Sequence, residues 1–124
     1  HRASLTRTKL KVALAKAELA RARAARRGRT RTRHLAAYRS ASPQDAICAV
    51  FGSYCSQALA VARCESGLQT TAHNGQYLGL FQMGSSERRI FGHGPTAVAQ
   101  AKAAHRYFVA SGRDWSPWSC KPWS

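Results

Sequence analysis

Acidic residues are scarce in this sequence. Its 124 residues include five Asp and Glu against twenty Lys and Arg, which gives a net charge of +15. Long apolar runs are also missing: none approaches the ~18 residues of a membrane span, so we expect no membrane span in this chain. The cysteines include no Cys-x-x-Cys pair and the histidines are scattered, which argues against a metal site. We expect no metal and no cofactor, and we recognise no secretory signal within the sequence.

The charges that are present divide the sequence into two parts. Residues 1–41 hold thirteen Lys and Arg and one acid, whereas residues 42–124 hold seven Lys and Arg and four acids. All cysteines, tryptophans, prolines and phenylalanines lie in the second part. We therefore expect a basic, Ala- and Arg-rich helical arm and linker over residues 1–41 and one globular domain over residues 42–124.

Four cysteines predict two disulfides, because so small a domain buries a limited core and often needs covalent staples. Free thiols and metal ligands are the alternatives. Cys48 falls near the end of one expected helix and Cys55 at the start of the next, which favours a Cys48–Cys55 bridge and leaves Cys64 to pair with Cys120. Disulfides indicate an oxidising compartment, so we expect a secreted protein.

The arm has the composition of a helix over residues 5–27, which are rich in Ala, Leu, Lys and Arg. Gly28 is expected to end this helix, and residues 29–42 to form a linker. The apolar stripe of the helix consists mostly of alanine and would bury little surface. We expect a helix that is solvated or that depends on a partner.

Start and stop signals predict four helices and a hairpin in the domain. The expected helices run from Ser42 to Gly52, from Ser53 or Ser56 to Gly67, around residues 86–91, and from Pro95 to Gly112. The Asn74–Gly75 pair predicts a β-hairpin. The expected fold class is α+β, mainly α, with one small hairpin.

Glu65 falls in the last turn of the second of these helices. There the negative end of the helix macrodipole disfavours an ionised acid, and partial burial would raise the pKa of the carboxyl further. A carboxyl that stays protonated near neutral pH suits general acid catalysis. The alternative is a solvated glutamate at a helix end, and the position alone favours that alternative.

Four motifs in order resemble the lysozyme-like lytic transglycosylases, including small secreted actinobacterial domains of the resuscitation-promoting-factor type. The motifs are ARCESGL (62–68), GLFQM (79–83), AAHRYF (103–108) and WSPWSC (115–120). The resemblance covers residues 43–122 and leaves the arm uncovered. It implies a small lysozyme-like domain with a peptidoglycan-binding groove between its helices and its hairpin.

The resemblance also implies roles for individual residues. Glu65 matches the catalytic acid, Gln82 the glutamine that faces the sugars, and Tyr107 the tyrosine near the acid. Ser66 follows the acid as in the family, and Tyr77, Leu80, Phe81 and Met83 would line or support the groove.

Each of these residues also has a structural alternative. Leu80, Phe81 and Met83 suit the core better than the site, and Tyr107 suits either. For Gln82 we favour the site, because a polar side chain among apolar neighbours needs a partner.

The implied activity is cleavage of the β-1,4 bond between MurNAc and GlcNAc in peptidoglycan glycan strands. The sequence holds no obvious second catalytic acid, which favours lytic transglycosylation by Glu65 alone with a 1,6-anhydro product. Hydrolysis by water, aided by Glu87, is the alternative within the enzyme class.

Outside that class, two readings stay open: a non-catalytic wall-binding module on the same fold, and a nucleic-acid-binding protein that uses RRGRTRTRH at residues 26–34. The cysteines argue against the second reading, and we expect no specific nucleic-acid partner. We expect a monomeric, cell-wall-associated enzyme whose basic arm binds anionic wall polymers.

Overall fold

The computed structural model describes residues 2–123 of the chain. The chain divides into two compact units, residues 1–36 and residues 37–124, and each is described by itself. The expected arm (1–41) and domain (42–124) stay a prediction, because a division in space does not show which part folds on its own.

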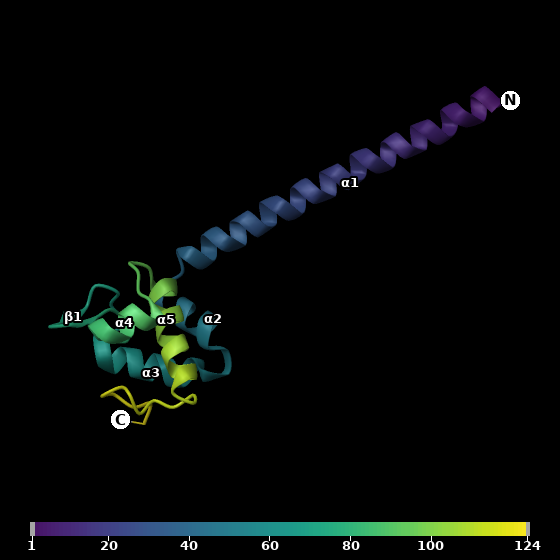
Figure 1. The fold of residues 1–124 in the computed structure, drawn as a ribbon. Coiled ribbons are helices and arrows are strands. Elements are labelled where there is room, and N and C mark those ends of the chain that lie inside the picture. The colour runs from purple at the N-terminus through teal and green to yellow at the C-terminus, as the bar shows by residue number, and fades with distance from the viewer. Residues whose placement is uncertain (1, 124) are drawn as a thin grey trace. The chain divides into compact units, whose positions relative to one another are not determined.

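The first unit consists of most of one long helix, α1 (Arg2–Arg39, 38 residues; Figure 1). The expected end at Gly28 and the linker after it are wrong. Gly28 has no left-handed φ of the kind that stops a helix, and Thr32 Oγ1 donates to its carbonyl oxygen at 2.9 Å. One helical glycine costs about 0.5–1 kcal/mol relative to alanine, and the good helix formers on both sides offset that cost.

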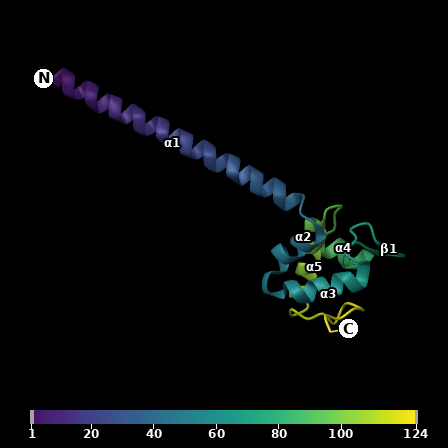
Figure 2. The same cartoon turned by 180° about the vertical axis from the view of Figure 1, so that it is seen from behind.

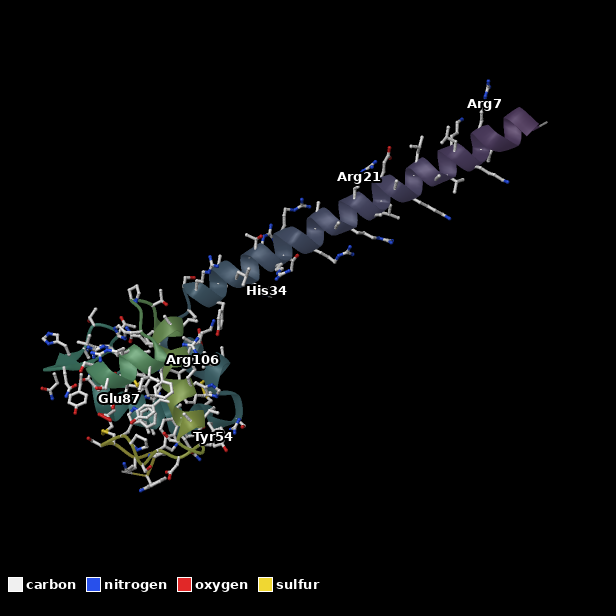
Figure 3. The ribbon with its side chains drawn as sticks, in the orientation of Figure 1. Arg7, Arg21, His34, Tyr54, Glu87 and Arg106 are labelled. Carbon is white, nitrogen blue, oxygen red and sulfur yellow. A yellow bond between two sulfur atoms is a disulfide. The ribbon has the colours of Figure 1, made fainter. Side chains whose placement is uncertain are left out.

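The side chains of α1 have no core to pack against within their own unit. From residue 7 to residue 37 all of them are exposed, and Figure 3 shows them projecting outward along the helix. The exposed set includes the large apolar side chains Leu10, Val12, Leu14 and Leu19. Exposure of these side chains agrees with both expected alternatives, a solvated helix and a helix that depends on a partner.

The second unit has the expected α+β class, mainly α, with a two-stranded hairpin. Its elements are α2 (Pro43–Phe51), the 3-10 turn η1 (Gly52–Tyr54), α3 (Cys55–Ser66), β1 (His73–Asn74), β2 (Tyr77–Leu78), α4 (Ser85–Phe91) and α5 (Ala97–Ala110). The two strands are antiparallel, with His73 opposite Leu78 and Asn74 opposite Tyr77. Gly75 opens the loop between them with φ 59°.

Most helix boundaries follow the expected signals. Ser42 caps α2 by accepting from the N–H of Asp45 at 3.2 Å. Gly52, with φ 57°, ends α2, and Gly67, with a left-handed φ of 64°, ends α3. Glu65 therefore lies in the last turn of α3, as predicted.

Two expected helix starts are wrong. Neither Ser53 nor Ser56 caps α3: the chain enters this helix directly from η1, and the N-cap residue is Tyr54, which makes no side-chain capping hydrogen bond. The last helix begins at Ala97 rather than at Pro95, because Thr96 Oγ1 accepts from the N–H of Ala99 at 3.1 Å and acts as the cap.

The core of the second unit is formed by α2, α3, α5 and the two segments that follow the hairpin and α5. Its aromatic centre is Phe108, whose ring centroid lies 4.4 Å from that of Trp115 and 5.7 Å from that of Phe51. Leu80, Phe81 and Met83 are buried, as the core alternative predicted. The largest fully buried side chains are Phe81, Phe108, Ile47, Leu80 and Val61.

Two disulfides close the unit, Cys48–Cys55 and Cys64–Cys120, and they confirm the predicted pairing. The first joins the end of α2 to the start of α3. The second ties the end of α3 to the C-terminal segment, which is drawn in yellow and runs beside α3 in Figures 1 and 2.

Residues Pro43–Ser66 form the stretch of 24 residues that, among the described residues, is long and apolar enough to cross a membrane by length and composition. The expectation that no run approaches this length is wrong by that measure. Gly52 divides the stretch into α2 and α3, of nine and twelve residues. Each is shorter than the ~20 residues that a span needs, and both contribute to the core.

Candidate active site

A groove of about 490 Å³ opens in the second unit between the end of α3, the hairpin, α4, α5 and the C-terminal segment. The five side chains predicted for the site all line it: Glu65, Ser66, Tyr77, Gln82 and Tyr107. They come from segments up to 42 positions apart in the sequence (65 to 107). The fold therefore brings all the predicted residues to one surface, although their roles there are untested.

Glu65 is the half-buried acid of this groove. Its Oε2 accepts from the N–H of Cys120 at 3.4 Å. Burial raises the pKa of the carboxyl from its ordinary 4.5, while the N–H groups of Cys120 and Ser119 and the charge of Lys121 oppose the rise in part. Because burial prevails, Glu65 keeps its proton to a higher pH than a solvated glutamate does.

The C-terminal segment forms the wall of the groove beside Glu65. The Cys64–Cys120 disulfide holds it there, with the two Cα atoms 5.9 Å apart. Trp118 anchors the same segment, because its indole Nε1 donates to the carbonyl oxygen of Phe81 at 3.0 Å. The wall that modulates the pKa of Glu65 is thus held by a disulfide to Cys64, the residue before the acid, and by a buried hydrogen bond to Phe81.

Ser66 and Gln82 line the groove, but both use their polar hydrogens on the protein. Ser66 Oγ donates to the carbonyl oxygens of Leu80 at 2.7 Å and Ala62 at 3.0 Å. Gln82, in a strained backbone conformation with φ 49°, donates from Nε2 to the carbonyls of Gly79 and Ala72. Both side chains therefore brace the groove, and the acceptor Oε1 of Gln82 is the atom suited to a sugar hydroxyl.

The two tyrosines give the groove its aromatic surfaces. The ring of Tyr107 stacks on Phe91, with centroids 5.0 Å apart, and leans on Trp118 at the same distance. Burial and the nearby charge of Glu87 raise the pKa of its phenol, so Tyr107 stays a hydrogen-bond donor. Tyr77 is 45% exposed and offers an open ring at the rim.

Glu87, on α4, also lines the groove (Figure 3). Sequence analysis named Glu87 only in the alternative of hydrolysis, because it belongs to none of the four motifs. Gly84 is buried beside it: a Cβ there would come within 2.6 Å of Glu87 Oε2 and 3.3 Å of the Tyr77 ring. The other late carboxylate, Asp114, is not a lining residue, and its Oδ1 accepts from the N–H of Ser116.

A half-buried acid at a helix end, facing an open groove beside a short hairpin, is the arrangement expected of a lysozyme-like domain. Residues 45–120 match the family described as "Lysozyme like domain", which is more than half of the chain. The chain therefore belongs to the lysozyme-like domain family, and the resemblance to lysozyme-like lytic transglycosylases is confirmed. Comparison with curated proteins and with solved structures gives no match.

Membership of this family indicates binding of peptidoglycan and an activity related to it. Together with the two disulfides it also indicates an extracellular location.

Proposed function

We propose that this protein cleaves the β-1,4 glycosidic bond between MurNAc and GlcNAc in peptidoglycan, with Glu65 as the single catalytic residue. The observation that carries the proposal is the state of Glu65, a half-buried carboxyl with a raised pKa on the surface of the groove. A general acid has to hold its proton near the operating pH and reach the leaving oxygen, and burial in an open groove supports both requirements.

The reaction we propose is non-hydrolytic. Glu65 protonates the glycosidic oxygen as its bond to the MurNAc C1 breaks, and the N-acetyl group of the substrate stabilises the cationic centre. The 6-hydroxyl of the same sugar then attacks C1 and gives its proton to Glu65, which restores the acid. The product carries a 1,6-anhydro ring, and no water is consumed.

The remaining predicted residues would bind the glycan. The Tyr77 ring at the rim offers an apolar face to a sugar, Gln82 Oε1 an acceptor, and the protonated Tyr107 phenol a donor. Ser66, whose hydroxyl donates to backbone carbonyls, would act by keeping the end of α3 against the Leu80 peptide.

A second candidate is hydrolysis, with Glu87 as the base that activates water. It is favoured by the position of Glu87 in the same groove as Glu65, since most glycosidases use two carboxylates. The phenol of Tyr107 lies close enough to Glu87 for its pKa to respond to the carboxylate charge.

Mass spectrometry of peptidoglycan digested with the full chain tests the proposal. Anhydro-muropeptides, lighter by one water than hydrolytic products, are the expected result, and they should persist in Glu87→Gln. Reducing-end products that disappear in Glu87→Gln would establish hydrolysis instead. Binding without any product would make the protein a wall-binding module.

We further propose that the basic arm binds anionic wall polymers and that the protein acts as a monomer. Support for the arm comes from its thirteen Lys and Arg and from the exposure of its side chains from residue 7 to residue 37.

A further inference from the structure

Gln100 is the buried polar side chain of the core, with 4% of its surface exposed. It lies on α5, outside the four sequence motifs, and it does not line the groove. A buried amide costs free energy unless its donors and acceptor are paired. Both polar atoms of the Gln100 amide have hydrogen-bond partners, which indicates a structural role for this side chain.

The three hydrogen bonds of Gln100 join three separate loops to α5. Its Oε1 accepts from the N–H of Leu80 at 2.8 Å, and its Nε2 donates to the carbonyl oxygens of Thr70 and Gly94, each at 3.0 Å. Thr70 lies between α3 and β1, Leu80 between β2 and α4, and Gly94 between α4 and α5. One side chain thus fixes the loops on both sides of the hairpin.

The backbone next to Leu80 is shaped around this amide. Gly79 has φ 82°, and a Cβ at this position would come within 2.5 Å of Gln100 Oε1. The neighbouring carbonyl of Gly79 accepts from Gln82 Nε2 at 2.9 Å. The contact with Gln100 therefore fixes the segment that presents Gln82 to the groove.

The same segment, residues 79–82, also contacts the end of α3 that carries Glu65. The N–H of Leu80 donates to Gln100, while the carbonyl oxygen of Leu80 accepts from Ser66 Oγ at 2.7 Å. Ser66 directly follows Glu65 at the end of α3. A short chain of hydrogen bonds thus runs from α5 through the Leu80 peptide to the turn that carries Glu65.

We propose that Gln100 is a positioning residue for the groove. It holds residues 79–82 against the end of α3, and so sets Glu65 and Gln82 in their relative places without contacting the substrate. The catalytic consequence of this inference rests on the proposed function of the groove. Its structural part, the dependence of the Leu80–Ser66 link on Gln100, stands independently.

The test compares Gln100→Met with Gln57→Met. Methionine has a similar length and forms none of the three hydrogen bonds. Gln57 serves as the control: its side chain is exposed, but its Oε1 accepts from the indole of Trp115 at 2.9 Å and so joins distant segments, and it does not line the groove. Turnover of soluble peptidoglycan fragments is measured below the unfolding temperature of every variant, together with thermal midpoints.

We expect kcat to fall in Gln100→Met on the order of 10- to 100-fold, since small displacements of catalytic groups cost this much. Gln57→Met should lose stability and keep its kcat. If Gln100→Met keeps kcat within about twofold of the wild type, or if Gln57→Met loses as much kcat, the proposal is overturned.

Gly79→Ala covers the case in which Gln100→Met does not fold, because it retains the amide and displaces it. It should lower kcat in the same way. An unchanged kcat in Gly79→Ala would count against the proposal.

Amide exchange separates this inference from the proposed function. In the wild type the Leu80 N–H should be protected, and in Gln100→Met or Gly79→Ala its protection should fall while the resonances of Ser66 and Glu65 shift. Those changes would support the positioning role even if the wild type cleaved nothing, and their absence would overturn it.

Discussion

The helices α1 and α5 are both rich in alanine, yet they meet opposite environments. Of the 38 residues of α1 ten are alanine, and of the 14 residues of α5 six are alanine. Seven residues of α5 are buried, whereas every described side chain from residue 7 to residue 37 is exposed. Alanine content therefore makes both segments helical without deciding whether either is packed.

The two helices differ in the residues that accompany their alanines. In α5 four of the six alanines are buried together with Val98 and Phe108, and their small side chains let the helix approach the core closely. In α1 the larger apolar side chains are isolated among Lys and Arg and are spread around the helix. The second unit thus has a packed core beside its groove, whereas α1 is an exposed helix of high positive charge.

The sharpest way to separate the two regions is Glu65→Gln. The amide cannot donate a proton and then retrieve it, so cleavage of soluble peptidoglycan fragments should fall by ~10²- to 10⁴-fold, the range of a general acid–base step. Binding to walls through the arm should persist. Product release is followed by chromatography, and near-normal activity of the variant would remove Glu65 from the mechanism.

The two disulfides should contribute unequally to the second unit. In the chain-entropy model, Cys64–Cys120, with a sequence separation of 56, contributes about 4 kcal/mol, and Cys48–Cys55, with a separation of 7, about 2 kcal/mol. Paired serine variants and urea unfolding measure the difference. A larger loss from Cys48→Ser/Cys55→Ser than from Cys64→Ser/Cys120→Ser would contradict the expectation.

Removal of residues 1–36, most of the arm, should weaken binding to cell walls and leave cleavage of soluble substrate unchanged. A chain that starts at Ala37 loses twelve of the twenty Lys and Arg. It keeps Tyr38 and Ala41, which pack against the core, and the contact of Tyr38 with the Lys102 ammonium, 5.2 Å from the ring centroid. We expect weaker retention on walls at low salt and unchanged cleavage of soluble fragments.

The salt dependence supplies the control for that truncation. Attraction between exposed charges is screened over ~8 Å at physiological ionic strength, so the full chain should approach the behaviour of the truncated chain as salt rises. Equal retention of both chains at low salt would make the arm a spacer. A preference of the full chain for duplex DNA over wall polymers at matched salt would favour the nucleic-acid reading.

The pH dependence of stability offers a smaller effect with a definite sign. The pKa of Glu65 is raised in the folded state above its ordinary 4.5, so ionisation of Glu65 destabilises the fold. The stability of the wild type should therefore fall relative to that of Glu65→Gln as the pH rises from about 4.5 through the folded-state pKa. The two stabilities should differ least below about pH 4.5. Urea unfolding at a series of pH values measures the difference, and a difference that shrinks with rising pH would contradict it.

The smallest expected change lies in the arm. Gly28→Ala should stabilise α1 by about 0.5–1 kcal/mol, because glycine lies in the helix interior without a left-handed φ. Circular dichroism of a peptide spanning residues 1–41 should show more helix, and the unfolding midpoint of the domain should not move. A loss of helicity would contradict this expectation and support the prediction that the helix ends at Gly28.

Local signals in the sequence were enough to predict the fold class, the disulfide pairs and the last-turn position of Glu65. Ser42 acts through a side-chain hydrogen bond within its own turn, and Gly52 and Gly67 act through their positive φ. These effects are local, and this is why they could be foreseen. The continuation of α1 through Gly28 could not be predicted in this way, since it depends on the helix propensity of the residues on both sides.

The residues that the sequence analysis missed, or assigned only to an alternative, depend on tertiary packing. Glu87 belongs to no motif and reaches the groove only because α4 lies beside it. Gln100 sits in a run of alanines on α5, and nothing near it in sequence shows that three distant loops will meet its amide. Whether Ser66 and Gln82 turn to the substrate or to the backbone also depends on carbonyls far away in the sequence.

The Cys64–Cys120 bond bears on when and where the groove comes into existence. During synthesis the segment with Glu65 emerges long before the wall that Pro117, Trp118 and Ser119 contribute, so a nascent chain holds the acid in an incomplete site. In a reducing cytoplasm the bond that fastens this wall does not persist. Maturation of the groove is therefore expected to wait for export and oxidation, which would keep the protein inert until it meets its substrate.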